Sequence, residues 1–157
     1  MRLLNKTAVI TGATSGIGLA TAEIFIREGA QVILIGRNQA RLEYLKRKLG
    51  QAASIISADV NNDGDLIRAC ELIQDQFGEK SIDIFFINAG IAYSTPLSLT
   101  EQQSYQDLMD TNVKSVFYSM QTFLPLLKDG ASVILNSAWL NTVGMPSRRP
   151  SGLRKTT

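Results

Sequence analysis

The stretch Thr11-Gly-Ala-Thr-Ser-Gly-Ile-Gly18 places three glycines in the order G-x-x-x-G-x-G. It follows a short apolar, β-rich run, Thr7 to Ile10, and precedes apolar residues at helical spacing that continue to Gly29. A glycine loop between a strand and a helix lets the backbone turn sharply and lets a phosphate reach the free N–H groups of the helix N-terminus. No Lys follows the last glycine, which excludes a Walker-type loop.

The rest of the chain repeats this alternation of strand and helix. Further strands are predicted at Gln31–Ile35, Ala53–Ala58, Ile82–Ile87 and Ser132–Leu135. Helices are predicted from the cap Asn38 to about Leu49, over Asp63–Phe77, and from a Thr100-x-x-Gln103 capping box to about Leu127, before a turn at Asp129-Gly130. The pattern predicts an α/β fold, a three-layer doubly wound parallel sheet of the Rossmann type. Five strands are present, and the sheet is expected to be incomplete at its C-terminal edge.

Composition narrows the class of protein. The 157 residues are about the size of one domain, and 45% are hydrophobic, enough for a core. The net charge of +2, with acids and bases interleaved, predicts neither a nucleic-acid partner nor an anionic membrane partner. No apolar run reaches the ~18 residues of a membrane span, and the N-terminus lacks a signal-peptide pattern. The expected location is therefore cytoplasmic.

The absence of histidine and the presence of a single cysteine exclude several kinds of catalytic and metal site. The chain has no histidine, so Ser-His-Asp and Cys-His catalysis and His-ligated metal sites are ruled out. Cys70 is the only cysteine, so an internal disulfide is impossible, and we expect no metal site. Acid–base chemistry would have to use Tyr, Lys, Asp or Glu.

Residues of the glycine loop and of the second strand's end are the predicted cofactor ligands. The loop contributes Gly12, Thr14, Ser15, Gly16, Ile17 and Gly18; the two hydroxyls add hydrogen-bond donors. Arg37 follows the second strand, where an acid would bind the ribose 2′-hydroxyl of NAD and an Arg can neutralise the 2′-phosphate of NADP. Arg37 therefore favours NADP, and NAD is the alternative cofactor. The non-functional interpretation is that Arg37 is simply a solvated side chain near a helix start.

Two further strand ends carry candidate ligands. Asp59 can accept from an adenine amino group and Val60 can cover the ring, although Asp59 taken alone is better explained by an Asx turn or a helix entry. Asn88-Ala89-Gly90 follows the fourth strand, and its small residues would let a cofactor pass close to the sheet. By themselves these residues are also consistent with an ordinary turn.

Taken together, the glycine loop, Asp59, Asn88-Ala89-Gly90 and Asn112 resemble the short-chain dehydrogenase/reductase family, in order and in spacing. The resemblance runs from about residue 5 to Pro146 and covers the N-terminal Rossmann portion of that family. It implies a nicotinamide cofactor and hydride transfer to or from a carbonyl or alcohol substrate. It also implies a homo-oligomer through the long helix that contains Asn112.

The catalytic half of the family pattern is only partly matched. The resemblance assigns Asn112 to the proton relay and makes Ser137 the available hydroxyl after strand five, although Ala138 stands in the register many members use. The family then requires Tyr-x-x-x-Lys, in which Tyr is the general acid/base. No Tyr follows Tyr118, and at the expected spacing the chain has Ser151 and Lys155. We therefore expect cofactor binding with little or no catalysis.

The sequence changes character after Pro146. Residues 147–157 contain four bases, no acid and one apolar residue, so the predicted domain spans residues 1–146 and the tail is expected to be disordered. One hypothesis is that the chain is a truncated or frame-shifted product of an NADP-dependent reductase. The alternatives are a non-catalytic dinucleotide-binding or sensing protein, and an interaction protein that uses the basic tail.

Overall fold

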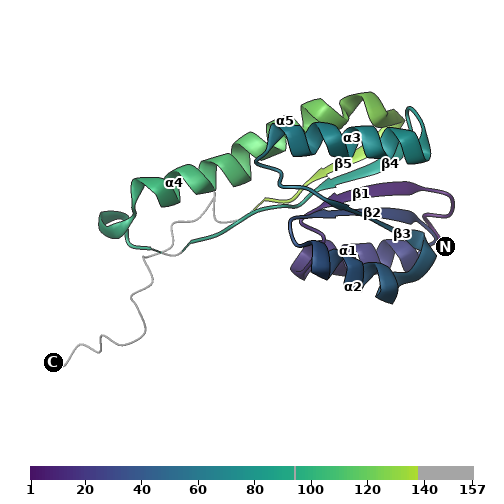
Figure 1. Cartoon of the computed structure of the whole chain (residues 1–157), viewed down its shortest axis with the longest axis horizontal. Coiled ribbons are helices and arrows are strands. Elements are labelled where there is room, and N and C mark those ends of the chain that lie inside the picture. The colour runs from purple at the N-terminus through teal and green to yellow at the C-terminus, as the bar shows by residue number, and fades with distance from the viewer. Residues whose placement is uncertain (94, 138–157) are drawn as a thin grey trace.

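The computed structural model describes residues 1–93 and 95–137 (Figure 1). The predicted calls that fall on Ala138, Ser151, Lys155 and the tail lie outside these residues. The strands and helices follow in chain order: β1 (Thr7–Thr11), α1 (Gly16–Arg27), β2 (Gln31–Gly36), α2 (Gln39–Leu49), β3 (Ala53–Ser57), α3 (Asp63–Phe77), β4 (Ile82–Ile87), α4 (Gln102–Met109), α5 (Ser115–Phe123) and β5 (Leu127–Leu135).

Within the described residues, five parallel strands form one sheet in the order β3-β2-β1-β4-β5. The chain moves outward from β1 to β3 and then crosses back to β4 beside β1. Val9 of β1 therefore lies between Ile33 of β2 and Phe85 of β4. This reversal opens a crevice at the carboxyl ends of β1 and β4, where ligands bind in open α/β sheets. The doubly wound Rossmann fold is confirmed.

Successive residues of each strand point to opposite faces, so the sheet has two cores. One face packs against α1 and α2, and the other against α3 and α5 (Figure 1). The α1–α2 core includes Ala8, Ile10, Val32, Leu34, Ala22, Leu42 and Leu45. The α3–α5 core includes Val9, Ile33, Ile35, Phe85, Leu66, Ile73 and Phe123. β1, β2 and β4, with both faces covered, are mainly apolar without alternation, whereas Val133, Ile134 and Leu135 of the edge strand β5 are exposed.

Local signals fix most element ends as expected. The side chain of Asn38 accepts a hydrogen bond from the Arg41 N–H and caps α2, which ends before Gly50 at a φ of 75°. Asn62 caps α3 in the same way, and α3 has the predicted bounds. Positive φ values favour glycine because an L side chain is strained there.

The long helix and the last strand differ from prediction. The helix begins at Gln102 and not from a Thr100 capping box, because Thr100 Oγ1 donates to the Pro96 carbonyl. It changes to π-helical geometry over residues 110–114 and ends at Phe123. β5 begins at Leu127, ahead of the predicted turn, because Leu127 already pairs with Ile82; Gly130, with a φ of 79°, takes up the irregularity inside the strand.

Candidate functional site

The glycine loop leaves the N-terminus of α1 open. Ser15 is the residue before the helix, and its side chain makes no capping hydrogen bond to the first turn. The first turn also carries no acidic residue. Gly16 has a φ of 53°, and nothing lies within 4 Å of the position where a Cβ would stand. The free N–H groups, the positive dipole end and the open space beside Gly16 together form a place for an anionic group such as a phosphate.

Two other glycines of the loop are required for close packing. A Cβ on Gly18 would stand 2.4 Å from the Gly12 carbonyl oxygen and 2.6 Å from Asn88 Nδ2. A Cβ on Gly12 would stand 2.8 Å from Ala89 Cα. Gly18 was predicted as a cofactor ligand, but it does not line the cleft beside the loop. The structure instead places it where α1 packs against the loop.

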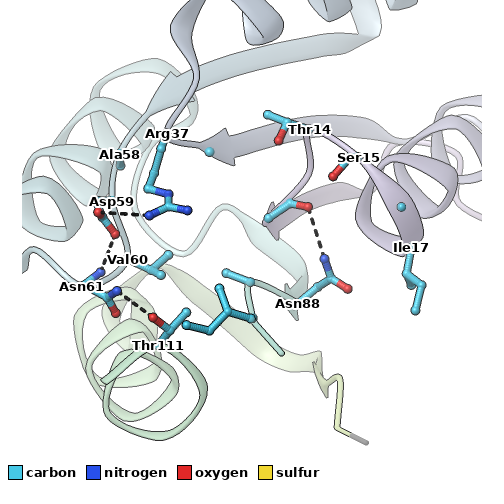
Figure 2. Close-up of a pocket in the computed structure, with 16 residues that line it drawn as sticks. Thr14, Ser15, Ile17, Arg37, Ala58, Asp59, Val60, Asn61, Asn88 and Thr111 are labelled. Carbon is cyan, nitrogen blue, oxygen red and sulfur yellow. Dashed lines mark hydrogen bonds and ion pairs between the residues drawn. The ribbon is translucent and has the colours of Figure 1, made fainter. Parts of the chain in front are cut away.

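A cleft of about 480 Å³ lies at the carboxyl ends of the strands, where the chain reverses between β1 and β4 (Figure 2). It brings together loops that follow β1, β2, β3 and β4. Its lining contains every predicted cofactor residue except Gly18. The lining residues are Gly12, Thr14, Ser15, Gly16, Ile17, Gly36, Arg37, Ala58, Asp59, Val60, Asn61, Asn88, Ala89, Gly90, Ile91 and Thr111.

One end of the cleft is cationic. Arg37 is 69% exposed, and its Nη1 lies 3.9 Å from Asp59 Oδ2 in a long, solvent-exposed ion pair (Figure 2). Such a pair contributes little stability, so the guanidinium remains available to an incoming anion. A second guanidinium, that of Arg41, is held nearby because its Nε donates to the Thr14 carbonyl at 3.3 Å. Arg41, which reaches the loop from the first turn of α2, was not predicted from the sequence.

The loop after β3 is an Asx turn that also faces the cleft. The backbone N–H of Asn61 donates to Asp59 Oδ1 at 3.0 Å, as in the simpler of the two predicted readings. The N–H of Asp59 in turn donates to Asp65 Oδ2 at 2.8 Å. Because the turn points the Asp59 carboxylate into the cleft, the two readings of Asp59 are compatible. Val60 is largely buried and forms an apolar part of the cleft wall beside Asp59.

Asn88 joins three segments at the centre of the site. Its Nδ2 donates to the carbonyls of Thr11 and Gly12 at 3.2 and 3.3 Å, and its Oδ1 accepts from Asn136 Nδ2 at 2.9 Å. Thr11 Oγ1 accepts from the N–H groups of Asn88 and Ala89. These bonds fix the loop after β4 against the glycine loop and against the end of β5.

The two predicted catalytic residues lie close to the cleft but do not line it. Asn112 is in the π-helical segment, and its side-chain amide holds Ile91: Nδ2 donates to the Ile91 carbonyl at 2.8 Å, and Oδ1 accepts from the Ile91 N–H at 2.9 Å. π-helical turns are often found at functional sites. Ser137 is exposed directly after Asn136, at the end of β5. Both residues are therefore next to the cleft lining: Asn112 binds Ile91, and Ser137 follows Asn136, which binds Asn88.

Several lining residues were not predicted from the sequence. Thr111 and Ile91 are ordinary helix and loop residues by pattern, yet Thr111 is buried and its hydroxyl accepts from Asn61 Nδ2 at 2.8 Å. Gly36 also lines the cleft, and a Cβ at this position would stand 2.7 Å from Thr14 Cγ2. Only the last of these was detectable, as a glycine at a predicted strand end.

Residues 1–93 and 95–137 contain no group of three or more Cys, Asp or Glu side chains arranged to hold a metal ion. No helix among them is long and apolar enough to cross a membrane. Cys70 lies on α3, and burial raises the pKa of its thiol, which disfavours the nucleophilic thiolate.

Comparisons with known proteins agree on one family. A family model described as short chain dehydrogenase matches residues 6–147. The chain is 36% identical to oxidoreductase asL5 of Sarocladium schorii over 98% of its own length and 62% of the relative's. It is 37% identical to serine 3-dehydrogenase of Agrobacterium fabrum over 85% of its own length and 53% of the relative's.

Solved structures show the same likeness. The crystal structure of a short-chain dehydrogenase/reductase described as a glucose/ribitol dehydrogenase from Brucella melitensis superposes with a TM-score of 0.87 and 28% identity. It covers 94% of this chain and 63% of the other. The chain thus spans about three fifths of the length of the first relatives and structures that it matches.

Proposed function

The chain belongs to the short chain dehydrogenase family, and from this premise we propose that its cleft binds a nicotinamide dinucleotide, preferably NADP(H). The observation that carries the proposal is the open N-terminus of α1 beside Gly16, at the edge of a cleft large enough for a small molecule. The family uses such a cofactor for oxidoreduction. When bound, the cofactor supplies or accepts the hydride.

The residues divide the cleft into three parts. The loop around Ser15 and Gly16 would hold the pyrophosphate through backbone N–H groups. Asp59 and Val60 would receive the adenine ring. Ala89 and Gly90, tied to the glycine loop through Asn88, would let the cofactor backbone pass toward Asn112 and Ser137.

The preference for NADP rests on two guanidinium groups, one that lines the cleft and one bound to a residue that lines it. Arg37 lines the cleft where β2 ends, and Arg41 is anchored to the glycine loop at Thr14. Guanidinium groups bind phosphate with bidentate geometry, whereas an acid at the Arg37 position would favour the free 2′-hydroxyl of NAD. NAD remains the alternative cofactor, because Asp59 lies opposite Arg37 and partly balances its charge.

The experiment is a fluorescence titration of the purified chain with NADPH and with NADH. We expect saturable binding of both and a lower Kd for NADPH. Absence of binding by either dinucleotide at millimolar concentration would overturn the proposal. A lower Kd for NADH would overturn only the assignment of Arg37.

We further propose that these 157 residues bind the cofactor with little turnover of a carbonyl or alcohol. A general acid typically accelerates such a proton transfer 10²–10⁴-fold. The sequence has no Tyr after Tyr118 to fill the family's acid/base position, and Ser137 is an aliphatic hydroxyl, a far weaker acid. This feature also favours the second candidate function, a non-catalytic dinucleotide-binding or sensing protein. An assay with NADPH and a panel of ketones, aldehydes and quinones separates the two, since turnover well above background would contradict the second candidate.

An exposed apolar stripe on the long helix suggests that the chain self-associates. Along α4, the π-helical segment and α5, apolar side chains recur every fourth residue and are exposed: Tyr105, Met109, Val113 and Phe117. We propose that this stripe packs on the same stripe of a second copy. Light scattering should show a dimer that Phe117→Glu converts to a monomer, and a wild-type monomer at high concentration would contradict the proposal.

A further inference from the structure

Two consecutive residues of the π-helical segment hold two different loops of the cleft. Thr111 Oγ1 accepts a hydrogen bond from Asn61 Nδ2 at 2.8 Å, on the loop after β3 (Figure 2). Asn112 holds Ile91, on the loop after β4, through both atoms of its amide. The segment therefore bridges the Asp59 side of the cleft and the side that contains Gly90 and Ile91.

Thr111 is fixed from both sides. Its side chain is bound by Asn61, and its carbonyl accepts from Ser115 Oγ at 2.7 Å. Thr111 and Ser115 are 8% and 2% exposed, whereas Val113 is 54% exposed. A π-helical turn is less favourable than an α-helical one and persists where side-chain contacts select it. The buried Thr111 therefore fixes the buried face of the π-helical segment through its hydrogen bonds to Asn61 and Ser115.

Asn61 is itself a rigid anchor. Its backbone N–H is bonded to Asp59 Oδ1, and the Asp59 N–H is bonded to Asp65 Oδ2 at the start of α3. The Asn61 side chain therefore projects from a hydrogen-bonded turn toward Thr111. A continuous path of hydrogen bonds and one peptide link runs from Asp59 through Asn61, Thr111 and Asn112 to Ile91.

We propose that Asn61 is a positioning residue for Asn112. Its amide holds Thr111, Thr111 holds the π-helical segment in register, and the segment holds Asn112 against Ile91. The inference deepens the proposed function and rests on it for one consequence: an adenosine group that contacts Asp59 steadies the Ile91 loop across the cleft. Cofactor binding at one end thereby orders the group that the family places in the proton relay.

The decisive measurement is hydrogen exchange of the Ile91 amide, which donates to Asn112, in the ligand-free protein. Asn61 is exposed, so we expect Asn61→Ala to fold. We expect this variant to exchange the Ile91 amide roughly threefold to tenfold faster, the effect of one neutral hydrogen bond. Thr111→Val should do the same, and Thr111→Ser, which keeps the hydroxyl, should restore the wild-type rate.

Asn62→Ala is the matched control. It removes an adjacent asparagine that caps α3 through Asp65 and has the larger general effect on stability. Exchange at Ile91 should stay within about twofold of wild type in this control. The cap uses the backbone N–H of Asp65, whereas the Asp59 anchor uses the Asp65 carboxylate. An unchanged Ile91 rate in Asn61→Ala, or an equal rise in Asn62→Ala, would overturn the inference.

The effect of an adenosine group on the Ile91 loop is tested by repeating the exchange measurement with adenosine 2′,5′-bisphosphate, which has no nicotinamide. In wild type and Thr111→Ser, its binding should slow exchange at Ile91; in Thr111→Val it should bind without slowing that exchange. Binding without any effect on Ile91 in wild type would overturn the coupling. Failure of wild type to bind this nucleotide would contradict the NADP preference in the proposed function, and failure to bind NADPH and NADH as well would overturn that function, while the ligand-free rates would still decide the role of Asn61.

Discussion

The two ends of the sheet are built from charged and polar groups in opposite ways. At the carboxyl ends of the strands, the N-terminus of α1 has no side-chain cap, Gly16 leaves open space, and Arg37 is mostly exposed. At the amino ends, the Asp83 carboxylate is 9% exposed and binds both Lys6, at 3.0 Å, and Lys128, at 2.7 Å. One end leaves its donors free for a ligand, and the other pairs its charges within the chain.

The electrostatics of Asp83 show how complete this pairing is. Burial has the largest single effect and raises the pKa of Asp83, but the hydrogen bonds from Lys128, the Thr7 N–H and Lys6 together outweigh it and hold the pKa below its usual value. The carboxylate joins β1, β4 and β5 at their starts. We infer that the amino end of the sheet contributes stability and the carboxyl end contributes binding, and the following changes test that division.

The largest expected effect is the loss of dinucleotide binding in Gly16→Val. The added side chain fills the space beside the α1 N-terminus and should weaken NADPH binding by roughly 100-fold or more, since phosphate needs close backbone approach. Gly50→Val is the matched control, because Gly50 also has a positive φ and open space but lies at the end of α2. Titration of both folded variants decides the point; equal affinities for NADPH would contradict the proposed phosphate site.

The next effect is on stability, at the opposite end. Asp83→Asn removes a charge that three donors bind and should lower the free energy of unfolding by about 1.5–3 kcal/mol, as measured by urea denaturation. The affinity of the folded protein for NADPH should not change. Asp129→Asn is the control, because the Asp129–Lys80 pair is exposed and should contribute less than about 0.5 kcal/mol. A large loss of NADPH affinity in Asp83→Asn would show that the two ends are not independent.

A smaller effect is expected for Arg37→Ala. Loss of an exposed charge-assisted contact should weaken NADPH binding about tenfold and leave NADH binding nearly unchanged. Arg47→Ala removes the same charge from the exposed far end of α2 and controls for net charge. Equal losses for the two dinucleotides in Arg37→Ala would make Arg37 a surface charge without a role in cofactor selection.

The smallest effect is the pH dependence of the amino end. A carboxyl whose folded pKa lies below its unfolded value of about 3.9 stabilises the protein above that pH, and this contribution is lost as pH falls through the folded pKa. The difference in unfolding free energy between wild type and Asp83→Asn should therefore be full at pH 6 and shrink below about pH 4. Urea denaturation across this range measures it, and a difference that grows on acidification would reverse the assignment.

Much of the fold was predictable because its signals are local. The apolar run at Ile82–Ile87, the caps Asn38 and Asn62, and the glycine loop each act within a few residues, and the structure confirms them. The predicted capping box at Thr100 was wrong because two groups near Pro96 compete for its hydroxyl: the Pro96 carbonyl and Thr95 Oγ1. The π-helical segment was not predictable, since the residues that select it are distant in sequence.

The sequence by itself determined the alternation of strands and helices, the glycine loop between the first strand and the first helix, and the exclusion of histidine-dependent chemistry. Only the tertiary structure decided that Gly18 packs against Gly12 and Asn88, and that Asn61 reaches Thr111 across 50 positions of the chain. The physical reason is range: backbone propensity and periodicity act over one or two turns, whereas a side chain's hydrogen-bond partner is set by the packing of elements that meet only after folding.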